Sequence, residues 1–311
     1  MSPALLRQSG NEGGLGLRPA SPSSPPRAPK QSGLWAWAGV APFFLFALLF
    51  MLLPSLSLLV GSFRDAQGNF TLENIRSLFT PSILSAYSIS IRISLVTALG
   101  GALFGFLLAY AVILGGLPRW ARDALLTFSG VASNFAGVPL AFAFVATLGR
   151  LGMLTVFLKA IGIDLYEAGF NLYSFWGLSF TYMYFQFPLM VLIIAPALEG
   201  LKREWREAAE NLGATAWQYW RMVALPILTP SILGAIILLF GNAFGAYATA
   251  LSLTGGLINL ITILIGAQMM GDVLYNPGLG YALSFGMIVV MALNMVVYYF
   301  LRKRSERWLK R

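Results

Sequence analysis

Residues 84–114 read LSAYSISIRISLVTALGGALFGFLLAYAVIL, an apolar run that contains a single charged side chain, Arg92. An α-helix needs about 20 predominantly apolar residues to cross a hydrocarbon core of about 30 Å. This run is longer than that minimum and keeps its one charge near its outer end. It therefore predicts a transmembrane helix.

The composition extends this interpretation to the whole chain. Of 311 residues, 58% are hydrophobic and only 11% are charged, whereas soluble domains carry about 25% charged residues. The mean hydropathy is +0.73. The chain has no Cys and no His, which excludes a disulfide framework, a thiolate metal site and the commonest general base. We expect neither catalytic residues nor a metal site.

Further runs of sufficient length predict an all-α, polytopic membrane protein with six transmembrane helices. The expected spans are approximately 34–62, 84–114, 122–148, 172–197, 228–252 and 277–301. The first is too long for the apolar region of a signal peptide. Residues 1–33, rich in Ser, Pro, Gly and Arg, predict a disordered cytoplasmic tail. We expect a transmembrane domain over residues 34–302 and a basic cytoplasmic tail over residues 303–311.

Small and polar residues interrupt the third and fifth predicted spans. Gly137 and Pro139 lie in the third, and Gly241 and Gly245 lie in the fifth. Small residues let helix backbones approach closely, but breaks of this kind also line polar pathways in transporters. We favour packing as the explanation and keep the pathway as the alternative.

The distribution of Lys and Arg predicts the orientation. Of the 21 basic residues, 16 lie in the N-terminal segment, in two alternate loops and in the C-terminal segment, and four lie in the three remaining loops. Cytoplasmic loops carry the excess of basic residues. We therefore expect a multi-pass protein of the bacterial inner membrane with both termini in the cytoplasm. The positive charge then indicates contact with membrane lipid and no nucleic acid partner.

One cytoplasmic segment, residues 198–227, differs from the other loops. The segment holds four acids and four bases, and its residues 199–212 predict a helix. Gly213 occupies the position where a left-handed C-terminal cap is common. A second short helix is expected from Ala216 to Val223, ending before Leu225-Pro226. Such a segment could insert into a groove of another protein or lie on the lipid headgroups, and the residues alone leave both possibilities open.

The spacing within this segment resembles a known signature. Glu207-Ala208-Ala209 is followed by three residues, Gly213, nine residues and Val223-Ala224-Leu225-Pro226. This resembles the EAA loop (EAA, three residues, G, nine residues, I-x-L-P) of the permease subunits of binding-protein-dependent ABC importers. Val223 in place of Ile is the one departure. The resemblance implies the type I importer permease (MetI-like) architecture.

The resemblance also implies partners and residue roles. The loop would dock as a coupling helix in a cytoplasmic ATP-binding subunit, present in two copies, beside a second permease subunit, expected to be a paralogue. A periplasmic binding protein would deliver the solute. Glu207 would pair with a basic group of the ATPase, Ala208 and Ala209 would allow close approach, Gly213 would set the turn, and Leu225 and Pro226 would fix the return to the membrane.

The chain itself is not expected to be an enzyme. It lacks a Gly-Lys-Ser/Thr phosphate-binding loop, so ATP is expected on the partner subunit and we expect no cofactor on this chain. The rival class is an ion-coupled secondary transporter or channel. Proton coupling would need a membrane-buried acid or His, but sodium coupling through backbone carbonyls stays physically possible.

The solute is less well indicated. Residues 133–142 and 187–190 look like the spermidine/putrescine-type branch of these permeases, which implies a polyamine. The best polar candidates for lining a pathway are Tyr182, Gln186, Asn242 and Tyr247. No acid lies deep within a span, although a polycation pathway would be expected to hold acids or aromatic rings. Arg92 is explained either by snorkelling to the outer interface or by contact with a partner subunit.

Overall fold

The computed structural model describes residues 33–271 and 274–309, and it divides the chain into two units, residues 1–53 and 54–311. Apart from Gly33, the predicted disordered tail lies outside the described residues. Within the described residues the structure is helical and has no strand. The first unit holds α1 (Gly33–Ala47) and the π-helical segment η1 (Leu48–Leu52).

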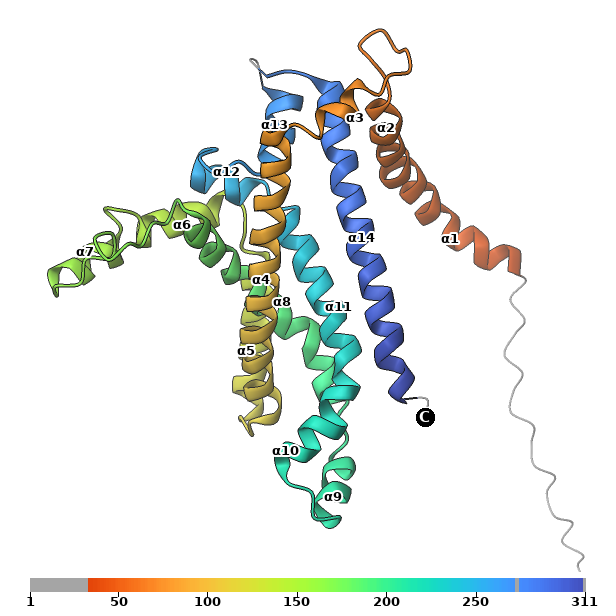
Figure 1. The fold of residues 1–311 in the computed structure, drawn as a ribbon. Helices are drawn as coiled ribbons and strands as arrows, with labels where there is room; N and C mark the ends of the chain where they lie inside the picture. Colours follow the sequence, from red (N-terminus) through yellow and green to blue (C-terminus); the bar gives the residue numbers. More distant parts are fainter. Residues whose placement is uncertain (1–32, 272–273, 310–311) are drawn as a thin grey trace, which may run out of the picture. The chain divides into compact units, whose positions relative to one another are not determined.

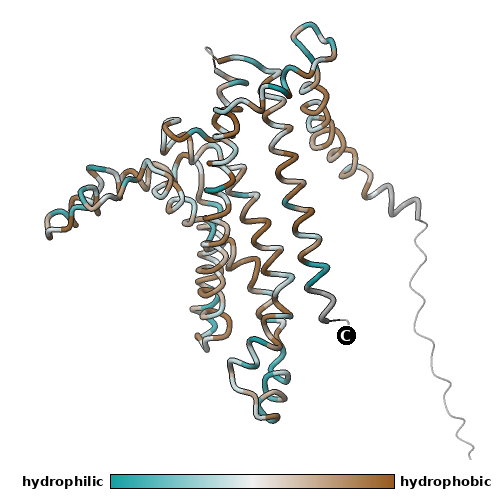
Figure 2. The backbone as a smooth tube through the Cα atoms, viewed as in Figure 1, coloured by the Kyte–Doolittle hydropathy of each residue, from teal (hydrophilic) through white to brown (hydrophobic). Residues whose placement is uncertain are grey.

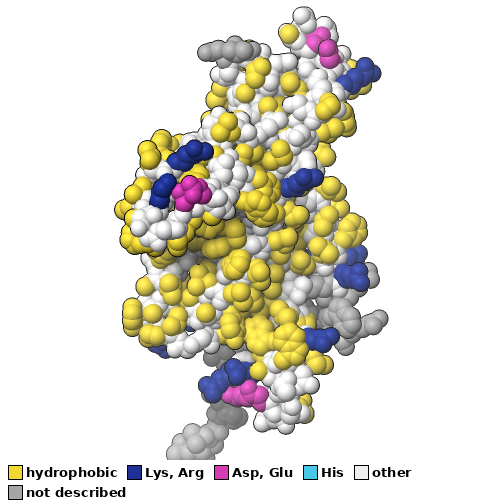
Figure 3. All heavy atoms as spheres, turned by 60° about the vertical axis from the view of Figure 1, so that its left-hand side comes forward, with side chains coloured by type: hydrophobic (Ala, Val, Ile, Leu, Met, Phe, Trp, Pro, Cys, Tyr) yellow, Lys and Arg dark blue, Asp and Glu magenta, His cyan; other side chains and the backbone are white. Residues whose placement is uncertain are grey.

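Six helical segments of the described residues are long and apolar enough to cross a membrane, as the sequence predicts. They are Gly39–Ser62, Pro81–Leu114, Val138–Ala160, Phe175–Glu199, Ala216–Phe244 and Pro277–Arg304. Figure 2 shows hydrophobic residues along the long helices, and hydrophobic side chains cover most of the face in Figure 3. Since lipid replaces water around such helices, this exposed apolar surface fits a membrane environment.

Two long helices form the centre of the second unit. α4 (Pro81–Leu114) packs along α8 (Phe175–Glu199), as Figure 1 shows. Small residues make the approach close: a Cβ added at Gly101 would lie 2.6 Å from Gln186 Cβ, and one at Gly105 would lie 2.6 Å from Met190 Cβ. Close backbone approach at small residues is the usual way that helices pack in membranes.

Two further helices complete the hydrophobic core of this unit. α11 (Leu225–Phe244) packs on α4, α8 and α14 (Pro277–Leu309). Leu228 and Leu239 of α11 and Ile194 and Leu198 of α8 are buried together. α14 continues as a helix beyond the predicted end at 301, so Lys303 and Arg304 extend the helix.

The third predicted span, 122–148, is wrong as a single helix. The chain forms α5 (Arg119–Asn134), breaks at Phe135–Gly137, and continues as α6 (Val138–Leu148) and α7 (Met153–Ala160). Figure 1 shows α6 and α7 turning aside from α5. Gly137 has a φ of +75°, a conformation that ends a right-handed helix and favours glycine.

The fifth predicted span, 228–252, is also divided. α11 ends at Phe244, residues 245–247 form a break, and α12 (Ala248–Thr254) follows. Gly255 and Gly256 then take positive φ angles of 57° and 86°. The glycines of both spans therefore mark real helix breaks, while Gly241 stays within α11.

The remaining helices are short and lie toward the other end of α4 from the loop 198–227. They are α2 (Leu53–Ser62), α3 (Glu73–Ser77) and α13 (Ile261–Met270), all seen in Figure 1. Asn259 Nδ2 donates to the Ser82 carbonyl at 3.2 Å, and Ser90 Oγ accepts from the Ile261 amide at 2.9 Å. These bonds tie the segment before α13 to the start of α4.

Candidate functional site

The loop between α8 and α11 contains a short charged helix, α9 (Arg203–Asn211). The predicted start at residue 199 is wrong, because α8 itself runs to Glu199 and the chain turns at residues 200–202 before α9 begins. α9 is stabilised along its surface by the ion pairs Arg203 Nε–Glu207 Oε1 at 2.7 Å and Arg206 Nε–Glu210 Oε1 at 2.9 Å. Each such exposed pair stabilises a helix by only about 0.3–0.5 kcal/mol.

Gly213 ends α9 as predicted. Its φ is +78°, its amide donates to Glu210 O at 2.9 Å, and the Ala214 amide donates to Ala209 O at 3.0 Å. These two bonds form a Schellman motif, in which a left-handed residue satisfies the last helical carbonyls. The turn that follows α9 is therefore set by a backbone conformation that glycine adopts without steric cost.

The second half of the loop runs without a break into the membrane helix. Thr215 and Gln218 form a capping box that starts α10 (Ala216–Tyr219). The π-helical segment η2 (Trp220–Ala224) joins α10 to α11, with the Leu225 amide bonded to Trp220 O. The predicted helix end before Leu225-Pro226 is therefore wrong. Pro226 has no amide to donate, and the wider π turn directly before it accommodates the change in hydrogen bonding.

The loop offers an exposed surface and is anchored from its inner side. Leu212, Trp217 and Met222 are 88%, 70% and 72% exposed, and the side chain of Glu207 is 54% exposed. Trp220 is half-buried, and its ring meets that of Tyr110 at the end of α4 edge to face, 5.2 Å between centroids. Exposed large apolar side chains beside charged ones are typical of a surface that binds another protein or the membrane surface.

The predicted coupling residues fall into two groups. Glu207 and Ala208 are exposed and Ala209 is half-buried, all on α9, with Gly213 at its end. Val223 lies in η2, and Leu225 and Pro226 open α11. An ion pair between Arg122 of α5 and Glu199 at the end of α8 lies outside both groups and was not predicted from the sequence.

The four predicted pathway residues also divide into two pairs. Tyr182 and Gln186 of α8 are buried, with exposed fractions of 1% and 0%. Tyr182 donates its hydroxyl hydrogen to the Ala246 carbonyl at 3.0 Å, and Gln186 Nε2 donates to Leu239 O at 2.8 Å. These two side chains therefore connect α8 by hydrogen bonds to α11 and to the break that follows α11.

Asn242 and Tyr247 line an open cavity of about 240 Å³. Both helix breaks contribute to it: Gly137 comes from the break after α5, and Tyr247 from the break after α11. The Gly137 amide donates to Thr249 Oγ1 at 2.7 Å and joins the first break to α12, which follows the second break. None of the described residues that line the cavity is charged. Ser133 and Thr249 also line it, and the interruption of the predicted spans was the signal that could have identified them.

Arg92 is exposed on α4, whose buried residues, such as Ile93 and Thr97, lie on another side of the helix. Among the described residues it forms no ion pair. Its guanidinium is therefore open to the surroundings of this chain, which agrees with either explanation suggested by the sequence.

Removing the Tyr182 hydroxyl tests whether its hydrogen bond to the Ala246 carbonyl stabilises the contact between α8 and the break after α11. We expect Tyr182→Phe to lower the free energy of unfolding by about 0.6 kcal/mol, the average for hydrogen bonds between membrane helices. Tyr184→Phe, on the same helix, is the matched control, since Tyr184 makes no hydrogen bond among those found in the described residues. Thermal unfolding in detergent compares the two variants, and equal midpoints would contradict the role of Tyr182.

Six helical segments that are long and apolar enough to cross a membrane define the described part of the chain as a polytopic membrane protein. Residues 101–311 match the family described as "Binding-protein-dependent transport system inner membrane component". The chain belongs to this family. It is accordingly a permease subunit of an ABC importer and a multi-pass inner-membrane protein.

Relatives with different named solutes match the chain. The spermidine/putrescine transport system permease protein PotB of Haemophilus influenzae is 28% identical, over 86% of this chain and 94% of its own length. The sulfate transport system permease protein CysT of Escherichia coli is 28% identical over 68% and 73%. The probable sulfate permease cysT of Nephroselmis olivacea is 27% identical over 72% and 73%.

The fold is also that of solved importers. A bacterial ABC transporter involved in the import of the acidic polysaccharide alginate matches with a TM-score of 0.66 and 19% identity, over 88% of this chain and 96% of the solved chain. The alginate transporter in complex with an alginate pentasaccharide-bound periplasmic protein matches with a TM-score of 0.67 at the same identity, over 88% and 94%. At this identity the likeness concerns the fold alone.

Proposed function

We propose that this permease subunit couples solute import to ATP hydrolysis on a separate subunit through the loop 198–227. The continuous helix from Ala216 to Phe244 supports the proposal most strongly. It connects the exposed loop directly to α11, which ends at the break beside the cavity. A displacement of the loop would therefore move α11 as a rigid element and alter the cavity.

The docking surface for the ATP-binding subunit is α9 with the turn at Gly213. Glu207 is exposed and held by Arg203 in an orientation along the helix surface, so a basic group on the partner could compete for its carboxylate. The small side chains of Ala208 and Ala209 leave the backbone of α9 accessible. The assembly would contain two such ATP-binding subunits, each on one permease.

A second permease subunit and a periplasmic binding protein complete the proposed assembly. α4 exposes a row of large apolar residues, with Leu103, Phe104 and Leu107 58%, 52% and 52% exposed, which suits contact with lipid or with the second permease. We propose a paralogue in that position. The distribution of Lys and Arg supports cytoplasmic termini, and the loop 198–227 then faces the ATPase.

The proposed solute is a small hydrophilic molecule, with a polyamine as the first hypothesis and sulfate as the second. The PotB and CysT relatives match at the same identity. The cavity favours neither by charge, since its described lining provides aromatic rings, hydroxyls and an amide. Uptake of labelled spermidine and labelled sulfate by the complete transporter, each with its purified binding protein, separates the two hypotheses.

Reversing the charge at Glu207 tests the coupling. We expect Glu207→Lys to lower ATP-driven uptake at least tenfold while the permease still inserts and folds, because the side chain is exposed and its ion pair stabilises α9 only slightly. Glu210→Lys, which removes the equivalent pair with Arg206, is the matched control. The measurements are uptake and ATP hydrolysis in proteoliposomes.

Wild-type uptake by the Glu207→Lys variant would contradict the coupling role. Uptake by this chain alone, driven by an ion gradient and without an ATP-binding subunit, would instead support the rival class of secondary transporter or channel. Family membership argues against that rival, and the experiment tests it directly.

A further inference from the structure

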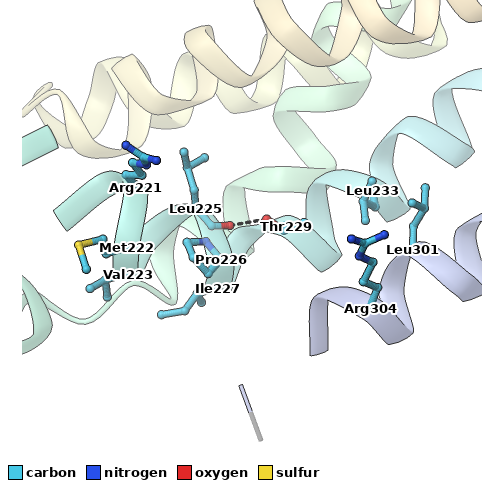
Figure 4. Close-up of a pocket in the computed structure, with 10 residues that line it drawn as sticks. All are labelled: Arg221, Met222, Val223, Leu225, Pro226, Ile227, Thr229, Leu233, Leu301 and Arg304. Atoms are coloured by element: carbon cyan, nitrogen blue, oxygen red, sulfur yellow. Dashed lines mark hydrogen bonds between the residues drawn. The ribbon is translucent and has the colours of Figure 1, made fainter. Parts of the chain in front are cut away.

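A groove of about 900 Å³ opens between the first turns of α11 and the last turns of α14. Its lining comes from η2 and α11 on one side and from α14 on the other, as Figure 4 shows. It is separate from the neutral cavity at the helix breaks, because the two share no described lining residue. The exposed residues Glu207 and Ala208 of α9 do not line it.

The walls of the groove are mainly apolar. Leu225 and Leu233 of α11 and Leu301 of α14 line it, and Leu225 and Leu301 are 37% and 45% exposed. The Thr229 hydroxyl also lies in the lining but already donates to the Leu225 carbonyl at 2.6 Å. The walls therefore offer an apolar surface for a hydrocarbon chain, and the hydroxyl in the lining already has a hydrogen-bond partner.

Two guanidinium groups are the charged part of the lining. Arg221 comes from η2 and Arg304 from α14, and no acidic residue lies among the described residues of the groove. Neither arginine belongs to an ion pair within the described part of the chain. Figure 4 shows the two at opposite ends of the group of side chains. Both are thus available to an anion.

The two arginines also lie at the same level of the membrane protein. Arg304 is the last residue of the candidate span Pro277–Arg304, and Arg221 lies in the first turns of the candidate span Ala216–Phe244. These spans run in opposite directions, so both arginines belong to the cytoplasmic side in the predicted orientation. Lipid headgroup phosphates lie at this level, directly above the acyl chains.

We propose that this groove binds an anionic phospholipid. An acyl chain lies along Leu225, Leu233 and Leu301, and the positive charges of Arg221 and Arg304 both attract the headgroup phosphate. Basic pockets between transmembrane helices on the cytoplasmic side bind anionic headgroups, and arginine suits phosphate because its planar donors match two oxygens at once. An anionic phospholipid provides both an acyl chain for the apolar walls and a negative charge for the two arginines. A lipid without net charge lacks the second, and a free phosphate lacks the first.

Lipid binding to the purified permease complex tests the proposal. Native mass spectrometry compares retention of phosphatidylglycerol and phosphatidylcholine by the wild type and by Arg221→Gln/Arg304→Gln. We expect wild-type preference for phosphatidylglycerol and about 30-fold weaker binding by the double variant, since each basic contact near the surface contributes about fivefold. Each single substitution should weaken binding by itself.

Two further variants distinguish lipid binding in the groove from general attraction of anionic lipid by surface charge. Arg119→Gln/Lys303→Gln removes the same charge from the same predicted side, at residues that do not line the groove, and should keep the affinity within about twofold of the wild type. Leu233→Trp keeps both arginines and fills the apolar wall, so it should weaken retention at least fivefold. The thermal unfolding midpoint of each variant confirms that it is folded.

Four outcomes would overturn the proposal. Equal retention of the two lipids would remove the anion preference, and equal loss in the control double variant would assign the effect to surface charge. Phosphatidylglycerol bound by the isolated chain but excluded from the assembled complex would show that a protein subunit covers the groove. Inorganic phosphate competing at millimolar concentration would indicate a free-anion site.

Discussion

Gly213→Val is expected to abolish most ATP-driven uptake while leaving the permease in the membrane. Gly213 has a φ of +78°, and a β-branched residue in a left-handed conformation costs at least about 1–2 kcal/mol. An added Cβ would meet no described atom within 4 Å, so the cost comes from the backbone conformation alone. Because 1.4 kcal/mol is a tenfold change in an equilibrium, we expect the loop to leave its docking conformation in most molecules.

The matched control lies in the same loop. Gly200 has a φ of −70°, and a Cβ there would lie 3.4 Å from the Ala197 carbonyl oxygen, at the edge of ordinary contact. Gly200→Ala should therefore retain uptake within about twofold. Uptake and ATPase activity of the reconstituted complex are measured for both. Normal uptake by Gly213→Val would show that the left-handed turn is not needed for coupling, and loss of the folded permease would show a structural role instead.

Gly105→Leu is expected to cause the largest loss of stability. A Cβ at this position would lie 2.6 Å from Met190 Cβ and 2.8 Å from the Phe187 carbonyl oxygen, both on α8. One of these is a backbone atom, so a rotamer change cannot relieve the contact. Overpacking in a well-packed core costs typically 1–3 kcal/mol, and here it separates the two central helices. We expect little folded protein after extraction in detergent.

Gly130→Ala is the control for Gly105→Leu. Gly130 is also helical, in α5, but an added Cβ there would meet no described atom within 4 Å. Alanine has the higher helix propensity, by about 1 kcal/mol, so this variant should unfold at the same or a slightly higher temperature. A scanning thermal assay of the purified chain gives the comparison. A Gly105→Leu variant that unfolds like the wild type would mean that α4 and α8 do not pack this closely.

These two glycines illustrate different constraints on one residue type. Gly213 is required by its own backbone conformation, and its position after a predicted helix made the turn foreseeable. Gly105 is required by a neighbour 85 positions away in the chain, Met190. Local sequence shows the first requirement directly. It shows only that the second residue is small.

The sequence by itself determined the class of this protein, the number of its spans and the position of its charged loop. The number of spans follows from the lengths of the apolar runs. The charged loop and the class of the protein follow from the distribution of Lys and Arg and from the spacing between Glu207 and Pro226. Such properties act over one helix or one turn, because a segment in lipid must satisfy the hydrogen bonds of its own backbone. They are readable without knowing the neighbours.

The tertiary structure alone decided whether the small residues inside the spans break the helices and what the polar residues there do. Gln186 and Tyr182 looked like pathway residues, but α11 presents the Leu239 carbonyl to Gln186, and the break after α11 presents the Ala246 carbonyl to Tyr182. Asn242 and Tyr247 face the cavity only because two breaks, far apart in sequence, meet there. A polar side chain within a membrane must find a partner, and whether that partner is a neighbouring helix or an open cavity depends on contacts that no local pattern encodes.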